Sequence, residues 1–110
     1  LKPDTGEIVA KAVAFIQENL NEELSIRLIA QRINASKSVL YKKFRDHFGC
    51  TIGEYINKKR VEQARKLLTT TSLSMEEISQ QCGFSSASYF TKMFKRYMGI
   101  TPLKFKKNLP

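Results

Sequence analysis

The 110 residues suit one small domain, and their nineteen lysines and arginines against ten acidic residues give a formal net charge of +9. This excess favours a polyanionic partner, with nucleic acid ahead of an acidic membrane surface. No apolar run approaches the roughly eighteen residues of a membrane span and no signal-peptide pattern is present, so we expect a cytoplasmic protein that binds no membrane.

Neither a metal site nor enzyme chemistry is indicated. Cys50 and Cys82 lack metal-ligand spacing and are too few for a disulfide framework, and the apolar stripe that includes Cys82 predicts a small buried side chain there. The single histidine, His47, lies beside Asp46 without a serine or cysteine nucleophile in a triad pattern. Since phosphate-binding glycine loops and paired catalytic carboxylates are also missing, we expect no enzyme, no metal and no cofactor.

The chain begins with a predicted amphipathic helix over residues 5–20. Asp4 and Glu7 have the spacing of a capping box, and apolar residues follow at steps of three and four. The outward positions carry no chemistry, so we interpret this helix as scaffold. Its apolar stripe consists of Ile8, Val9, Ala12, Val13, Ile16 and Leu20.

A helix-turn-helix motif is predicted next, over about residues 25–48. Ser25 can cap its first helix, and Asn34 suits the turn because asparagine tolerates the left-handed backbone conformation. The second helix, residues 37–48, has an apolar back and a polar, cationic front, which suits a helix that enters a nucleic-acid groove. Its back consists of Val39, Leu40, Phe44 and Phe48, and its front of Lys37, Ser38, Tyr41, Lys42 and Arg45.

A long connecting helix is predicted over about residues 52–69. Gly49 ends the preceding helix, and Thr51 and Glu54 form a capping box for this one. At ~1.5 Å per residue it spans about 25 Å, so it can serve as a stiff connector between two DNA-reading helices that must reach groove segments about 34 Å apart. Arg60 lies on its inner stripe, where a structural pairing is favoured over DNA contact because an inward charge needs a partner.

A second helix-turn-helix motif is predicted over about residues 74–98. Ser74 and Glu77 cap its first helix, Gly83 provides the left-handed turn, and a serine among residues 85, 86 and 88 caps the next helix. A final helix begins at Thr101 and Pro102. The apolar stripe of the recognition helix is Tyr89, Phe90, Met93, Phe94 and Tyr97, and its front is Ser88, Thr91, Lys92, Lys95 and Arg96.

The two motifs are copies of one pattern. A shift of fifty positions places Phe94 over Phe44 and Gly99 over Gly49, while upstream the shift is forty-nine, so the second turn has gained one residue. Two copies are too few for a solenoid, and they predict two DNA-reading units in one small protein.

The second copy resembles the signature of the AraC/XylS family of bacterial transcription regulators, in Gly83-Phe84, Ser88-Tyr89-Phe90, Phe94-Lys95 and Gly99-Ile100-Thr101-Pro102. The resemblance runs from about Ile8 to Lys106. It implies an all-α, seven-helix domain that binds duplex DNA in a sequence-specific manner to regulate bacterial transcription. Family members often carry a preceding sensing or dimerisation domain, and some contact RNA polymerase. Because the chain starts with Leu1, we expect a fragment of a longer regulator, with a free-standing small activator as the alternative.

The resemblance also implies which residues contact DNA. Lys42 and Lys92 suit phosphate as well as guanine, and Lys92 stands where the family often has arginine; Tyr41 suits either DNA or a contact with Arg45 on its own helix. A different function class, a basic helical module that binds RNA or an acidic protein, also fits the charge. The candidates for base contact are Ser38, Tyr41, Lys42, Ala87, Ser88, Thr91 and Lys92. Those for phosphate contact are Lys37, Arg45, Ser86 and Lys95, with backbone N–H groups near Thr51 and Thr101.

Overall fold

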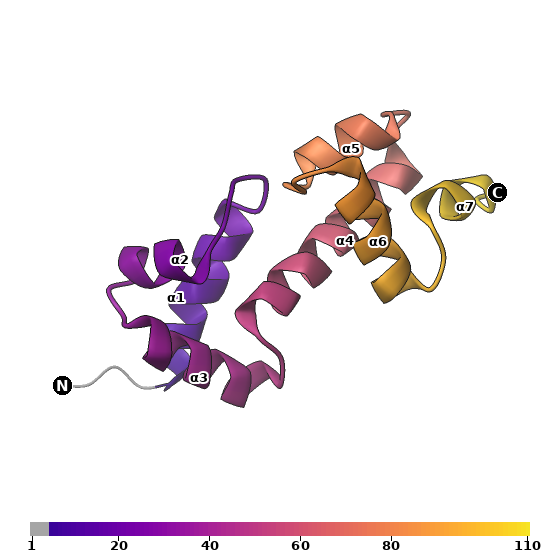
Figure 1. Ribbon diagram of the computed structural model, residues 1–110. Helices are drawn as coiled ribbons and strands as arrows, with labels where there is room; N and C mark the ends of the chain where they lie inside the picture. Colours follow the sequence, from indigo (N-terminus) through magenta and orange to yellow (C-terminus); the bar gives the residue numbers. More distant parts are fainter. Residues whose placement is uncertain (1–4) are drawn as a thin grey trace. The chain divides into compact units, whose positions relative to one another are not determined.

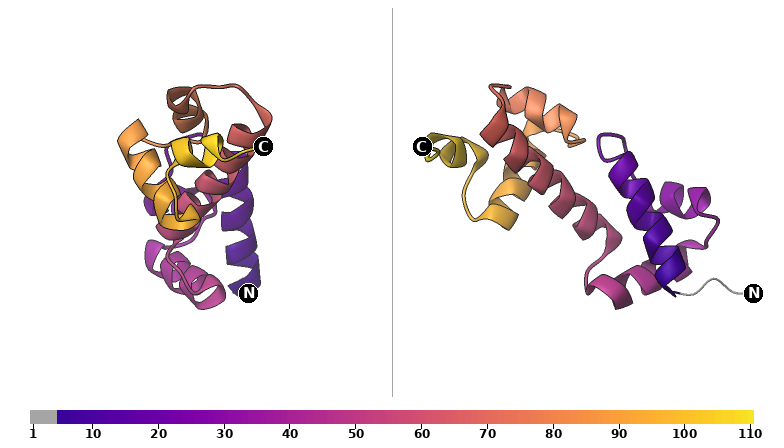
Figure 2. Two further views of the ribbon diagram at one scale, coloured as in Figure 1. Left: turned by 90° about the vertical axis from the view of Figure 1, so that its right-hand side faces the viewer. Right: turned by 180° about the vertical axis from the view of Figure 1, so that it is seen from behind.

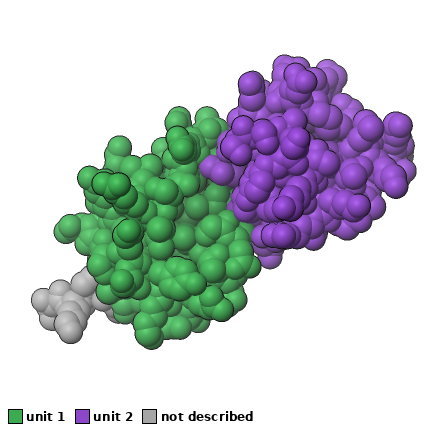
Figure 3. Space-filling view, in the orientation of Figure 1, with its two compact units in different colours: residues 1–56 green, residues 57–110 purple. Residues whose placement is uncertain are grey.

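The computed structural model describes residues 5–110, and all regular structure in that range is helical (Figure 1). This confirms the prediction of an all-α fold with seven helices, while Asp4 of the proposed capping box lies outside the described residues. The chain divides into two compact units, unit 1 (Leu1–Ile56) and unit 2 (Asn57–Pro110), coloured separately in Figure 3. The helices are α1 (Thr5–Glu18), α2 (Ile26–Arg32), α3 (Lys37–Phe48), α4 (Ile52–Thr70), α5 (Met75–Gln81), α6 (Ala87–Met98) and α7 (Pro102–Lys107).

Unit 1 is built from α1, α2, α3 and the first turn of α4. The three complete helices pack against one another in pairs, and they stay together in the three views of Figures 1 and 2. Phe44 of α3 meets Tyr55 of α4 edge to face, with the ring centroids 5.1 Å apart. The core consists of Ile8, Ala12, Ile16, Ile29, Ala30, Leu40, Phe44, Ile52, Tyr55 and Ile56.

Unit 2 is built from the rest of α4 with α5, α6 and α7. Phe94 is fully buried and meets two other rings, Phe90 at 5.8 Å and Phe105 of α7 at 5.6 Å. This ring contact packs α7 against α6, which explains why such a short helix is held in place. The core consists of Val61, Ala64, Leu68, Ile78, Cys82, Phe84, Phe90, Met93 and Phe94.

The helix starts follow from the hydroxyl residues that precede them. The side chain of Ser25 accepts a hydrogen bond from the N–H of Leu28, as predicted, and Ser86 is the serine that caps α6. The capping box of Ser74 and Glu77 is complete in both directions. The first helix ends at Glu18 rather than residue 20, because the Asn19 side-chain amide donates to a carbonyl of the last turn.

Both helix-turn-helix motifs begin their turn in the same way. Asn34 and Gly83 adopt left-handed conformations, with φ of 58° and 82°. In each motif the next residue closes the end of the helix: Ala35 N–H donates to Ala30 and Phe84 N–H to Ser79, at 2.9 and 3.0 Å. The second turn then needs one more residue before α6 begins, which confirms the extra residue inferred from the sequence shift.

Three apolar residues predicted on the packed backs of the recognition helices are exposed, so that part of the prediction is wrong. Val39 and Tyr89 are 39% and 38% exposed. Each precedes a fully or almost fully buried residue by one position, which turns its side chain about 100° away from the centre of the stripe. Phe48 is 40% exposed at the end of α3, although its ring still contacts Phe44 at 4.8 Å. On α4, Val61 is buried, although we did not place it in the core from the sequence.

Candidate nucleic-acid interface

The front of α3 forms one continuous exposed face. Ser38, Tyr41, Lys42 and Arg45 recur at three- and four-residue steps, and all four are exposed, as is Lys37 at the start of the helix. The opposite side of α3 is fixed by the fully buried Leu40 and Phe44. The packing of the back therefore determines which side chains face outward, as the prediction required.

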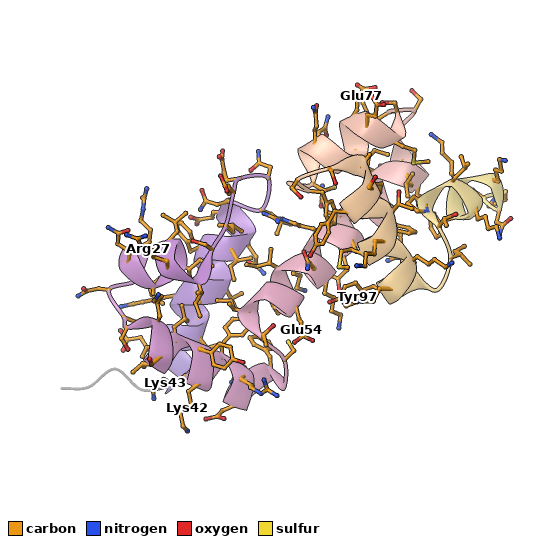
Figure 4. All side chains as sticks on the ribbon, in the orientation of Figure 1. Arg27, Lys42, Lys43, Glu54, Glu77 and Tyr97 are labelled. Atoms are coloured by element: carbon orange, nitrogen blue, oxygen red, sulfur yellow. The ribbon has the colours of Figure 1, made fainter. Side chains whose placement is uncertain are left out.

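Two of the α3 candidates already have partners on their own helix. Lys42 Nζ forms an ion pair with Asp46 Oδ2 at 3.1 Å, and Arg45 Nη1 donates to Tyr41 Oη at 3.2 Å. The contact of Tyr41 with its own helix is thus the one present in the free protein. The Lys42 side chain is 78% exposed and points away from unit 1 (Figure 4), so DNA can replace this partner at the cost of a weak i,i+4 pair.

The front of α6 has a different set of internal contacts. Ala87, Ser88, Thr91 and Lys92 are all exposed, with Lys95 one turn further on. Thr91 Oγ1 donates to the carbonyl of Ala87 at 2.9 Å, which leaves its methyl group and its acceptor lone pairs for a partner. Because α6 contains no acidic residue, neither Lys92 nor Lys95 has an ion-pair partner on its own helix.

The hydroxyl candidates for phosphate contact are also helix caps. The oxygens of Ser86, Thr51 and Thr101 each accept a backbone N–H three residues on, at 3.1 to 3.2 Å. Each hydroxyl hydrogen remains able to donate. At the start of α4, however, Glu54 Oε1 accepts the N–H of Thr51 at 3.3 Å, and this carboxylate competes with a phosphate for the positive end of the helix.

Two contacts that the sequence did not reveal position the first turn of α6. Asn57 of α4 donates from Nδ2 to Tyr89 Oη at 3.0 Å. The buried Ser79 of α5 donates to the carbonyl of Ser86, the capping residue of α6, at 3.3 Å. Both contacts tie the recognition helix to neighbouring helices of unit 2. The sequence gives one signal for the second contact, since Ser79 is a serine on an otherwise apolar stripe of α5, and none for the contact made by Asn57.

Arg60 and Cys82 are buried beneath this turn. Burial lowers the pKa of the Arg60 guanidinium, an effect that its interactions with Cys82 and Tyr89 oppose. Burial raises the pKa of the Cys82 thiol to about 11, with Arg60 acting in the other direction. Arg60 is only 8% exposed, which supports its structural interpretation, and the prediction that Cys82 is a small buried residue is confirmed.

Two negative findings apply to residues 5–110. None of the helices formed by these residues has the length and apolar character needed to cross a membrane. In the same part of the chain, histidine, cysteine and carboxylate side chains form no group of three or more that could hold a metal ion.

Comparison with known proteins identifies the family. The model of a helix-turn-helix domain family matches residues 29–108. A probable transcription factor of Proteus vulgaris, PqrA, is 41% identical over 88 residues, which cover 80% of this chain and 72% of PqrA. The xylose operon regulatory protein of Escherichia coli K12 is 33% identical over 102 residues, and here the chain covers 26% of the relative's length.

The fold agrees with these matches. The DNA-binding domain of the global transcriptional factor AdpA, solved in complex with a target DNA, superimposes with a TM-score of 0.86 at 29% identity, over 90% of this chain and 89% of that one. These are transcription regulators and not enzymes. The chain belongs to the AraC/XylS family of helix-turn-helix transcription regulators, and its function is sequence-specific DNA binding.

Proposed function

We propose that this chain regulates bacterial transcription by placing α3 and α6 in successive major-groove segments of one duplex. The observation that carries the proposal is the repetition of one arrangement: each recognition helix has a buried back, a capped start and an exposed polar and cationic front. A single such helix would suit many partners. Two such helices suit the regularly repeating major groove of a DNA duplex, because they are joined by the unbroken α4, whose nineteen residues span about 28 Å.

Within this proposal the exposed front residues divide into two roles. Base edges are read by Ser38, Tyr41 and Lys42 on α3 and by Ala87, Ser88, Thr91 and Lys92 on α6. Phosphates are held by Lys37, Arg45, Ser86 and Lys95 and by backbone near Thr51 and Thr101. The contact near Thr51 is the weakest of these, because Glu54 already occupies that helix start.

The proposal extends to partners outside this chain. The match covers 26% of the length of the xylose operon regulatory protein, which its name describes as a regulator of an operon. By analogy, we propose that a sensing or dimerisation domain acts together with this DNA-binding chain and that RNA polymerase is contacted on the promoter. We also propose that the chain acts in the cytoplasm, where bacterial DNA lies.

Selection of binding sites from random duplexes tests the proposal directly. The purified chain should enrich two short motifs about one helical turn apart at both a low and a high salt concentration. Duplex DNA should also displace single-stranded RNA and an acidic peptide from the chain. Steep salt dependence without any enriched motif, or preference for the RNA or the peptide, would refute sequence reading and favour the basic interaction module instead.

A further inference from the structure

Unit 1 contains a hollow that the DNA-binding proposal does not use. It lies between α1, the turn that joins α2 to α3, and the first half of α3, and it has a volume of about 430 Å³. Typical small-molecule sites occupy about 300 to 1,000 Å³. Its apolar lining comes from Ile8, Ile33, Ala35 and Val39. The hollow therefore has the size and the apolar lining of a small-ligand site.

The exposure of Val39 is explained by this hollow. Val39 lies on a helix side that faces other protein, yet 39% of it remains exposed because the space beside it is not filled by a side chain. Ile33 and Ala35, on the turn, are only partly buried for the same reason. An apolar group seated in the hollow would remove all three from water, which favours its binding.

The charge of the lining selects the sign of the ligand. Two lysines, Lys11 of α1 and Lys43 of α3, line the hollow, and none of the residues from 5 to 110 that line it is acidic. Lys11 makes an exposed ion pair with Glu7 at 3.1 Å, the kind of contact that a second carboxylate can share or replace. Asn34 and Ser36 add polar atoms at the edge. The lining thus combines an apolar surface with two cationic groups.

We propose that this hollow, the α1–α3 pocket, binds a small amphipathic carboxylate. Its compact apolar body packs against Ile8, Ile33 and Val39, and its carboxylate is held by Lys43 and Lys11. A DNA phosphate does not fit this description, because it offers no apolar body. The pocket borders Ser36, the residue that caps α3, so an occupant contacts the start of the recognition helix.

Three probes that share one apolar body test the proposal: cyclohexanecarboxylate, cyclohexylmethanol and cyclohexylmethylammonium. Each is titrated into the ¹⁵N-labelled chain without DNA, and backbone amide shifts are followed by NMR. We expect saturable shifts at residues 8–11 and 33–43 with the carboxylate, about tenfold tighter binding than for the alcohol, and the weakest binding for the ammonium ion. Because no DNA is present, this result is independent of whether the chain reads DNA.

Matched variants locate the carboxylate. Lys43→Gln or Lys11→Gln should reduce the affinity for cyclohexanecarboxylate toward that for the alcohol, while Lys95→Gln in unit 2 should leave it unchanged. The amide spectrum of each variant shows that it is folded, and two pocket variants are used so that one unstable protein does not decide the result. Shifts that do not saturate, shifts centred outside unit 1, or equal affinity for all three probes would overturn the proposal.

Discussion

The two helix-turn-helix motifs have the same backbone arrangement but differ in how charge is distributed over them. Residues 25–48 carry six basic residues and one acidic residue, whereas residues 74–98 carry three basic and two acidic residues. Unit 2 as a whole is nevertheless the more cationic, with eleven basic residues against three acidic ones, compared with eight against seven in unit 1. Its excess lies mainly on α4 and α7. The net charge of a unit therefore does not show which recognition motif is more cationic.

The difference in charge is clearest in α2 and α5, the first helix of each helix-turn-helix motif. Arg27 of α2, labelled in Figure 4, corresponds to Glu76 of α5 after the shift of forty-nine residues, and Glu77 follows it. The helix caps and turns are conserved between the copies because the backbone needs them. The charge at Arg27 and Glu76 is free to differ because neither residue forms part of a cap or a turn, whereas Glu77 also completes the capping box of α5. We expect the first motif to contribute more of the salt dependence of DNA binding. We expect DNA binding by the second motif to depend more on the hydrogen bonds that fix the position of α6.

The largest expected effect comes from the equivalent core phenylalanines. Phe44→Ala and Phe94→Ala each remove a fully buried ring and should lower the free energy of unfolding by about 3–5 kcal/mol. Urea unfolding measures the loss, and hydrogen exchange shows where it occurs. We expect increased exchange in unit 1 for the first variant and in unit 2 for the second. Equal increases in both units for both variants would mean that the two cores behave as one.

Glu62→Pro tests whether an unbroken α4 is needed to couple the motifs. Glu62 is exposed within α4, so proline there should cost about 3 kcal/mol through the lost helical hydrogen bond and the ring clash. Glu62→Ala is the matched control, since it also removes the contact with Lys59. We expect only the proline variant to lose the fixed spacing between selected motifs. A folded proline variant with the original affinity and footprint contradicts the spacer role.

Cys82 should make unit 2 sensitive to alkaline pH, because its counterpart in the first motif, Ile33, cannot ionise. Its folded pKa of about 11 exceeds the ordinary value of 9.0, so the unfolded chain loses the thiol proton first. The free energy of unfolding should be unaffected below about pH 9 and should fall by about 2–3 kcal/mol as the pH rises through 11.

The difference between the wild type and Cys82→Ala isolates this titration from the lysines and tyrosines that ionise in the same range. Urea unfolding of both proteins across this pH range provides the measurement. Parallel pH profiles for the two proteins would exclude the thiol as the cause.

The smallest expected effect is the difference in DNA affinity between Lys42→Ala and Lys92→Ala. Lys92 has no acidic partner on α6, whereas Lys42 must give up Asp46 to reach DNA, so Lys92→Ala should weaken binding more. If Lys92 reads a base, its loss should relax preference at one position by about 1–3 kcal/mol; if it holds phosphate, binding should fall equally for all sequences. Binding isotherms on selected and mutated sites distinguish these results. A larger loss for Lys42→Ala contradicts the comparison.

Much of the fold was predictable because it depends on local chemistry. The serine and threonine caps, the left-handed Asn34 and Gly83, and the glycine stops each follow from neighbouring residues alone. The exposure of Val39 and Tyr89 was not predictable from spacing alone, because an apolar residue at the edge of a helix stripe is covered only where a neighbouring element packs over it, and the space beside Val39 is a hollow. The bonds that fix α6, from Asn57 and Ser79, join residues that become neighbours only in the tertiary structure. The candidate DNA contacts remain predictions.

The hydrophobic stripe of α4 changes partner partway along the helix. Ile52 and Ile56 belong to the core of unit 1, while Val61 and Ala64 belong to that of unit 2. Cut between the units, α4 would leave a piece of five residues (52–56) and a piece of fourteen (57–70). The first is far too short to form a helix alone, and the second falls in the range of about 12–15 residues in which an isolated helix is only marginally stable. Each copy of the motif therefore packs against part of α4, and the other copy stabilises the same helix through the other part. A fragment that contains only one copy would lose the part of α4 that packs in the other unit, so we expect it to be less stable than the same copy in the whole chain.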